Sequence, residues 1–130
     1  MDCFYPSDNP VCYIFGDVYF SHEAIKAIVE TETFGIMLFG SKKPFAPSYP
    51  KPYREPFAYK VVDQARFREA IKRTKKLHKQ GRFSRHPIAW ELWKVICDTP
   101  LHKKPRGYTV INDYTCDIDT PEDTRRFEDD

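Results

Sequence analysis

The chain is organised around residues 63–86, which read DQARFREAIKRTKKLHKQGRFSRH. At about 100° per residue, the apolar side chains in this stretch fall on one arc, and this spacing predicts an amphipathic helix. Asp63 is suited to cap the first turn of that helix, and Gly81 is suited to end it in a left-handed conformation. The apolar arc comprises Phe67, Ala70, Ile71, Thr74, Leu77 and His78.

The opposite arc of the predicted helix is basic, with only Glu69 to balance its charge. Like charges three and four residues apart on a helix repel one another, and a face that serves only for solvation usually mixes signs. This face is typical of a surface that binds a polyanion, and a solvated structural face is the alternative. Phosphate contacts of this kind give affinity but little sequence specificity. The expected contacts are Arg66, Arg68, Lys72, Arg73, Lys75, Lys76, Lys79, Arg82 and Arg85.

The charge of the chain is segregated along its length. Residues 1–40 hold one Lys or Arg against six Asp or Glu, residues 41–86 hold fourteen against three, and residues 87–130 hold six against ten. The formal net charge is nevertheless only +2. The chain is therefore dipolar, and its middle part attracts anions more strongly than the net charge suggests.

Length and composition indicate one folded domain. The chain has 130 residues, of which 41% are hydrophobic and 15% aromatic, and these values are typical of a domain with a packed core. We expect a globular domain over residues 1–116 with a Pro- and aromatic-rich loop at 44–56, followed by an acidic, mobile tail over 117–130. The tail could fold onto the basic helix when no partner is bound.

The apolar runs on either side of the basic helix predict an α+β fold. Residues 11–20 are interpreted as one hairpin turning at Gly16-Asp17, and residues 107–118 as a second hairpin. The prediction is a single domain with a mainly antiparallel sheet built from these N- and C-terminal hairpins and about three helices packed against it. The predicted helices cover 21–31, 63–81 and 87–98, and the remaining predicted strands cover 34–39 and 57–62.

The loop at 44–56 contains five prolines, which the interior of a helix or sheet does not accept. Aromatic residues recur in this loop at four-residue spacing, with Lys51 and Arg54 between them. One interpretation is a loop attached to the body by its rings. The other is a surface for protein binding or for stacking of unpaired bases, in which aromatic and basic side chains act together. The candidate residues of such a surface are Phe45, Tyr49 and Tyr53.

Sequence motifs for catalysis or metal binding are weak. The four cysteines and four histidines form no close pair at the spacing of a structural zinc site. The glycines are isolated, so no phosphate-binding loop is present. Asp117 and Asp119 would share one side of a strand, but a two-metal site needs further carboxylates. The residues favour binding over catalysis, and we expect no cofactor and no metal.

The chain lacks both an apolar run of bilayer length and the basic and apolar regions of a secretory signal, so we expect it in the cytoplasm of its own cell or of a host cell. The leading hypothesis is a non-enzymatic protein that contacts DNA, RNA or a nucleoprotein complex through the basic helix. The alternative is a protein-binding inhibitor or adaptor of the phage or mobile-element accessory type. Such a protein would act on a host nucleic-acid-processing complex, using charge for steering and aromatic side chains as anchors.

Overall fold

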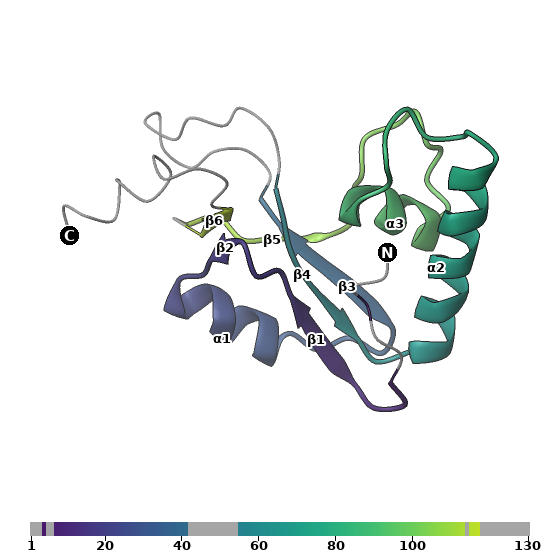
Figure 1. The fold of residues 1–130 in the computed structure, drawn as a ribbon. Helices are drawn as coiled ribbons and strands as arrows, with labels where there is room; N and C mark the ends of the chain where they lie inside the picture. The colour runs from purple at the N-terminus through teal and green to yellow at the C-terminus, as the bar shows by residue number, and fades with distance from the viewer. Residues whose placement is uncertain (1–3, 5–6, 42–54, 114, 118–130) are drawn as a thin grey trace.

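The computed structural model describes residues 4, 7–41, 55–113 and 115–117. In this part of the chain, three helices pack with a four-stranded mixed sheet, and a two-stranded sheet completes the structure (Figure 1). The fold is therefore α+β, as the sequence predicted. The helices are α1 (His22–Glu30), α2 (Gln64–Lys79) and α3 (Ala89–Ile96). The strands are β1 (Val11–Ile14), β2 (Val18–Tyr19), β3 (Ile36–Gly40), β4 (Pro56–Val61), β5 (Thr109–Val110) and β6 (Cys116–Asp117).

The larger sheet is mixed, so the prediction of a mainly antiparallel sheet is wrong. Its strand order is β1-β4-β3-β5, in which β4 runs antiparallel to both of its neighbours and β5 runs parallel to β3. The first strand occupies the outer side of β4, and the chain that returns after α3 pairs with the free side of β3. The resulting parallel pair is a consequence of tertiary packing, which no local pattern in residues 107–118 could indicate.

The two predicted hairpins also pair differently from the prediction. The turn at Gly16-Asp17 is present, and the Val18 amide donates to the Phe15 carbonyl across it at 3.3 Å. The strands on either side of that turn then separate, because β1 pairs with β4 and β2 pairs with β6. Pairing β1 with β4 places the Tyr13 ring against α2, which buries aromatic surface that an isolated hairpin would leave in water.

Helices cover both faces of the larger sheet (Figure 1). On one face, α1 packs its Ala24 and Ile28 side chains into a core with Phe39 and Ala58 of the sheet. On the other face, α2 and α3 pack together over a second core that includes Tyr59. Seven of the eight α3 side chains are buried, so α3 packs over the sheet beneath the protein surface. The basic side of α2 faces outward.

The strand β4 contains a bulge that increases the core beneath α1. Phe39 pairs with Ala58 and Gly40 pairs with Pro56, so Phe57 is passed over in the register. The extra residue in one strand allows neighbouring side chains to point to the same side of the sheet. As a result, Phe57 and Ala58 both enter the α1 core, and both are completely buried.

Gly40 lies where three segments meet. A Cβ atom at this position would stand 2.7 Å from the Glu55 carbonyl oxygen and 2.9 Å from Cη2 of Trp90, so only glycine fits. Beside it, the Ser41 amide donates to the Glu55 carbonyl and the Glu55 amide donates to the Ser41 hydroxyl, both at 2.8 Å. These bonds join the two ends of the predicted 44–56 loop, of which Pro56 itself begins β4. Phe45, Tyr49 and Tyr53 lie outside the described residues.

The N-terminus of α1 is connected to the C-terminal part of the chain. As predicted, Ser21 caps the helix, and its hydroxyl accepts from the Ala24 amide at 2.9 Å. The same hydroxyl donates to the carboxylate of Asp113, which also accepts from the Thr115 amide at 2.7 Å. Burial alone would raise the pKa of Asp113, but these bonds, with one from the Thr115 side chain, hold it below its ordinary value. The predicted tail is described only at Asp117, which lies in β6.

The C-terminus of α1 is capped by a lysine from the sheet. Lys60 of β4 donates from Nζ to the carbonyl oxygens of Ile28 at 3.1 Å, Val29 at 2.7 Å and Thr31 at 2.6 Å. The last turn of α1 has no basic residue of its own, so this single ammonium group satisfies carbonyls that the helix leaves without partners.

Within the described residues, no helix combines the length and apolar character that crossing a bilayer requires.

Candidate functional site

Both ends of the predicted basic helix are confirmed by their hydrogen bonds. The Asp63 carboxylate accepts from the Arg66 amide at 3.0 Å, which is the expected N-cap. At the other end, Gly81 has a φ of 71°, and its amide donates to the His78 carbonyl at 3.0 Å. The Arg82 amide then donates to the Leu77 carbonyl at 3.0 Å, which completes a Schellman motif and turns the chain out of the helix.

The third helix is shorter than the predicted range 87–98. It begins at Ala89 because the Glu91 carboxylate accepts from the Ile88 amide at 3.1 Å, an interaction that caps the first turn. It ends because Asp98 adopts a left-handed conformation with a φ of 53°. The shorter helix leaves two connecting segments, one before it and one after it, which lie together beyond the C-terminal end of α2 (Figure 1).

The first half of the basic face is connected to the body of the protein. Nη2 of Arg66 donates to the Ile96 carbonyl at 3.2 Å, which links α2 to the end of α3. Nη1 of Arg68 donates to the Ser7 carbonyl at 3.1 Å and lies 3.7 Å from a carboxylate oxygen of Asp8. These two arginines therefore have structural partners, and the sequence had assigned both of them to ligand binding.

The middle of the face carries ion pairs at the surface. Nζ of Lys72 lies 3.6 Å from the Glu69 carboxylate, and Nη1 of Arg73 donates to the Asp98 carboxylate at 3.0 Å. All four side chains are more than half exposed. Exposed pairs of this kind contribute about 0–1 kcal/mol each, so a phosphate could replace the carboxylate at little cost. Lys75 is also exposed on this helix.

Within the part of the chain that the structure describes, several cations without an acidic partner gather at the C-terminal end of α2. Lys76, Lys79 and Arg82 are exposed and make no side-chain hydrogen bond or ion pair with the rest of the described chain. Arg85 donates from Nε to the Glu91 carboxylate at 2.9 Å, but its side chain remains 61% exposed. The guanidinium group of Arg85 therefore has further N–H donors available for an anion.

A hollow of about 780 Å³ lies beside these residues, between the segment that follows α2 and the segment that follows α3. Its cationic wall is formed by Arg82, Arg85 and Lys94, and Phe83, Pro100 and Leu101 provide apolar surface. Lys94 is fixed there by a bond from its Nζ to the Leu101 carbonyl at 3.1 Å. The hollow therefore combines positive charge with an aromatic ring.

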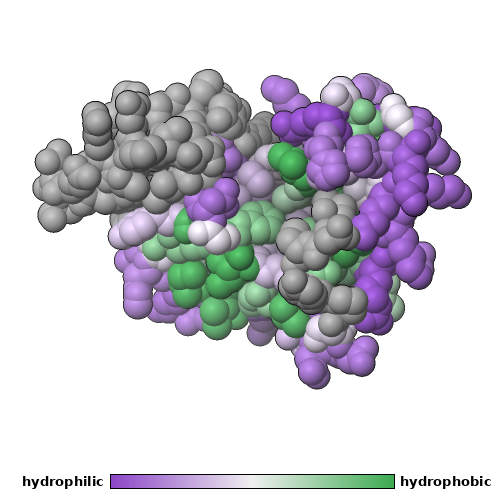
Figure 2. Space-filling view, in the orientation of Figure 1, coloured by the Kyte–Doolittle hydropathy of each residue, from purple (hydrophilic) through white to green (hydrophobic). Residues whose placement is uncertain are grey.

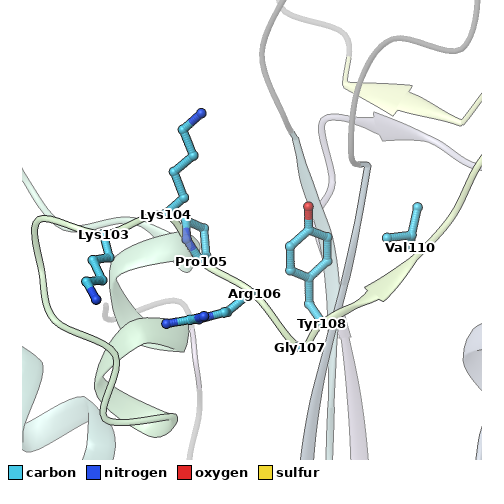
Figure 3. Close-up of a pocket in the computed structure, with 7 residues that line it drawn as sticks. All are labelled: Lys103, Lys104, Pro105, Arg106, Gly107, Tyr108 and Val110. Atoms are coloured by element: carbon cyan, nitrogen blue, oxygen red, sulfur yellow. The ribbon is translucent and has the colours of Figure 1, made fainter.

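A second hollow of about 560 Å³ lies further along the segment that follows α3. Figure 3 shows Lys104 and Tyr108 on either side of it, with Arg106 between them in the chain. His102 lines the first hollow and Lys103 lines the second, so the two hollows are adjacent. Trp93 supports this segment from the core, because its Nε1 donates to the Arg106 carbonyl at 2.9 Å.

The cations at the C-terminal end of α2 and those around the two hollows form one surface, which we call the basic end. Figure 2 shows hydrophilic side chains continuing from the outer side of α2 onto the segments beyond its C-terminus. Sequence reasoning missed the contribution of the segment after α3, although residues 102–106 read HKKPR. That run was hidden because it lies in a part of the chain where acidic residues outnumber basic ones. The basic end comprises Lys76, Lys79, Arg82, Arg85, Lys94, Lys103, Lys104 and Arg106.

The described residues do not assemble a metal site of ordinary composition. No group of three or more His, Cys, Asp or Glu side chains among them is placed to hold a metal ion. The imidazole rings of His78 and His86 meet with centroids 4.7 Å apart, which gives two potential ligands where a structural zinc site uses four.

Burial raises the pKa of the Cys97 thiol, although the Arg66 guanidinium acts to lower it. A raised pKa keeps the thiol protonated near neutral pH and weakly nucleophilic.

Comparison of the chain with protein-family models, with curated proteins and with solved structures finds no match.

Proposed function

We propose that the protein binds nucleic acid, without catalysis, through the basic end. The observation that supports this proposal best is the convergence, from separate segments, of cations that have no hydrogen-bond or ion-pair partner among the described residues. Lys76 and Lys79 come from α2, Arg82 comes from the turn after it, and Lys103 and Lys104 come from the segment after α3. Acidic side chains are present nearby, but the described ones are already engaged with arginines. A surface with this composition attracts a chain of phosphates.

The placement of the cations narrows the original hypothesis. The sequence predicted contacts along the whole basic face of α2, whereas the arginines of its first turns are bonded to backbone carbonyls of the protein. The proposed interface is therefore centred on the C-terminal end of the helix and not on its midpoint. Arg66 and Arg68 are assigned mainly structural roles, and Lys72 and Arg73 lie at the margin of the interface.

The proposal is tested by the salt dependence of binding. With about five phosphate contacts, the logarithm of the affinity for duplex DNA should fall with the logarithm of salt concentration at a slope of about −4 to −5. Fluorescence anisotropy of a labelled oligonucleotide, titrated at several salt concentrations, measures this slope. Absence of binding to duplex and single-stranded oligonucleotides alike at about 50 mM salt, or binding that does not respond to salt, would contradict the proposal.

Charge-removing variants locate the interface. The double variant Lys79→Gln/Arg82→Gln should weaken binding and reduce the magnitude of the salt slope by about 2, because each phosphate contact contributes about 0.9. Lys26→Gln is a matched control, since Lys26 is exposed on α1, across the sheet from α2. This control should bind as the unaltered protein does. The control removes one charge and the double variant removes two, so a loss in the control about half as large as that in the double variant would show that binding responds only to net charge.

A second candidate function, a protein-binding inhibitor or adaptor, is favoured by a separate observation. Figure 2 shows hydrophobic surface gathered over α1. Ile25 and Val29 of this helix are 37% and 62% exposed, and Phe34 in the following segment is 95% exposed. Ile25 and Val29 lie four residues apart on one face of α1, and exposed apolar side chains grouped in this way are typical of a protein-binding surface. A double variant, Val29→Ser/Phe34→Ser, should then abolish capture of a partner after nuclease treatment and leave nucleic-acid binding unchanged.

A further inference from the structure

The larger hollow of the basic end has a property that duplex binding does not require. The phosphates of a duplex lie on a convex surface, which a flat or ridged cationic surface can contact. The hollow beside Phe83 is instead concave, and its volume of about 780 Å³ is within the range of about 300–1,000 Å³ that is typical of small-molecule sites. A concave site of this kind suits a group that projects from its backbone, as an unpaired base does.

The composition of the hollow also matches an unpaired nucleotide. The Phe83 ring is half-buried against the main core, so its inner part is held in place while the rest lines the hollow. Proteins that bind single strands combine such rings, on which bases stack, with cations that follow the phosphates. Arg82 and Arg85 lie on either side of Phe83 in the chain and line the same hollow. The Glu91 carboxylate accepts from Nε of Arg85 and so orients the guanidinium group, while the Arg85 side chain remains 61% exposed.

We propose that the protein binds single-stranded nucleic acid, with one base in this hollow against Phe83 and the adjoining phosphates on Arg82 and Arg85. The proposal rests on the proposed function and specifies its ligand. The bound nucleic-acid strand continues past His102 onto Lys103, Lys104 and Arg106, because the protein segment after α3 joins the first hollow to the second. The lysines and the arginine of the second hollow bind phosphates of the neighbouring nucleotides.

The test compares strands of equal length. Labelled oligothymidine of about 15 nucleotides and a duplex of the same length are titrated with the protein at about 50 mM salt. The single strand should bind more tightly than the duplex. Phe83→Leu keeps an apolar side chain but removes the ring, so it should lower the affinity for the single strand about fivefold to a hundredfold. The affinity of this variant for the duplex should change less than about twofold, because phosphate contacts remain.

Phe34→Leu is the matched control. Phe34 is 95% exposed, and its neighbour Gly35 accepts through its carbonyl from the Asp63 amide at the N-terminal end of α2. This end is opposite the hollow, so the control should bind both oligonucleotides as the unaltered protein does. If Phe83→Leu weakens both ligands equally or neither, or if the duplex binds as tightly as the single strand, the single-strand proposal is wrong while the proposed function stands. If neither ligand binds, both proposals fail.

A second measurement needs no substitution and so does not depend on the stability of Phe83→Leu. Ultraviolet light crosslinks thymine to side chains that it contacts, and mass spectrometry of the digested complex identifies the crosslinked peptide. A crosslink at Phe83 or within residues 82–85 would support the proposal. Crosslinks found only elsewhere, for example within residues 22–34, would overturn it.

Discussion

Replacing Lys60 with methionine should destabilise the protein much more than its position on a strand suggests. The Lys60 ammonium group donates to three carbonyl oxygens at the end of α1, at 2.6, 2.7 and 3.1 Å. Methionine preserves most of the length and apolar volume of the lysine stem. The substitution therefore removes the three bonds and the positive charge at the helix C-terminus and changes little else.

The expected loss in the free energy of unfolding depends on whether the three hydrogen bonds contribute independently of one another. A hydrogen bond to a charged group contributes about 1.5–3 kcal/mol, and a cation at a helix C-terminus adds about 0.3–1 kcal/mol. The three bonds share one charge, and the bond to Val29 is exposed to water, so the bonds do not add as three separate terms. One full charged bond and the dipole contribution together give a loss of about 2–4 kcal/mol. For a chain of this size, that loss corresponds to a fall in Tm of roughly 6–15 °C.

Urea unfolding followed by far-ultraviolet circular dichroism measures this change, and Lys72→Met is the control. Lys72 is 76% exposed and lies 3.6 Å from a Glu69 side chain that is 77% exposed, so its loss should cost less than about 0.5 kcal/mol. If both variants unfold within about 0.5 kcal/mol of each other, the ammonium–carbonyl contacts add little to stability. The reasoning about α1 would then be refuted.

Three further predictions concern the turn after α2, the connection to α1 and the tail. Gly81→Ala should cost about 1 kcal/mol in urea unfolding because the φ of Gly81 is +71°, whereas Gly16→Ala should be nearly neutral because it has equally open space without a left-handed φ. Equal effects of these two substitutions would contradict the assigned backbone strain. Asp113→Asn should lower stability by about 1 kcal/mol at pH 7, because the amide nitrogen cannot accept from Ser21 as the carboxylate does. The pKa of Asp113 is lowered on folding, so its contribution is present above its ordinary unfolded value of about 3.9 and is lost as pH falls through the folded value. The difference between Asp113→Asn and the unaltered protein in unfolding experiments should therefore shrink in acid, and a difference that stays constant with pH would be contrary to this assignment. Deleting residues 118–130 removes six acidic and two basic residues and should tighten oligonucleotide binding at low salt, while unchanged affinity in anisotropy titrations would exclude competition by the tail.

The features that the sequence predicted correctly depend on local chemistry. The basic helix could be identified with both of its ends because Asp63 bonds to an amide three residues away and Gly81 adopts the left-handed conformation that favours glycine. The Ser21 cap of α1 was predictable for the same reason. In each case the residues that decide the structure lie within a few positions of one another, so a short window of sequence contains the whole interaction.

The features that were missed depend on distant partners. The pairing of β2 with β6 joins Tyr19 to Cys116, and no pattern within either short segment indicates the other. The prediction of which side chains face a ligand was limited in the same way, because it also depends on contacts between distant segments. Whether Arg66 binds a ligand or the Ile96 carbonyl depends on where α3 packs, which the spacing along α2 does not specify. Lys103 belongs to the last third of the chain, in which acidic residues outnumber basic ones, but the fold brings it close to the basic residues of another segment.

The close approach of Trp90 to Gly40 has a consequence for recognising distant relatives. Of the two atoms that exclude a side chain at position 40, one belongs to the backbone at Glu55 and cannot be removed by substitution. The glycine is therefore required by the fold itself, whereas the residues of the basic end, apart from the partly buried Lys94, are exposed and can be substituted without disturbing the core. In a homologue with an unrelated ligand, the glycine at the end of β3 should persist, together with a large aromatic residue in the first turn of α3. This pair is thus a marker of shared ancestry that is independent of shared function.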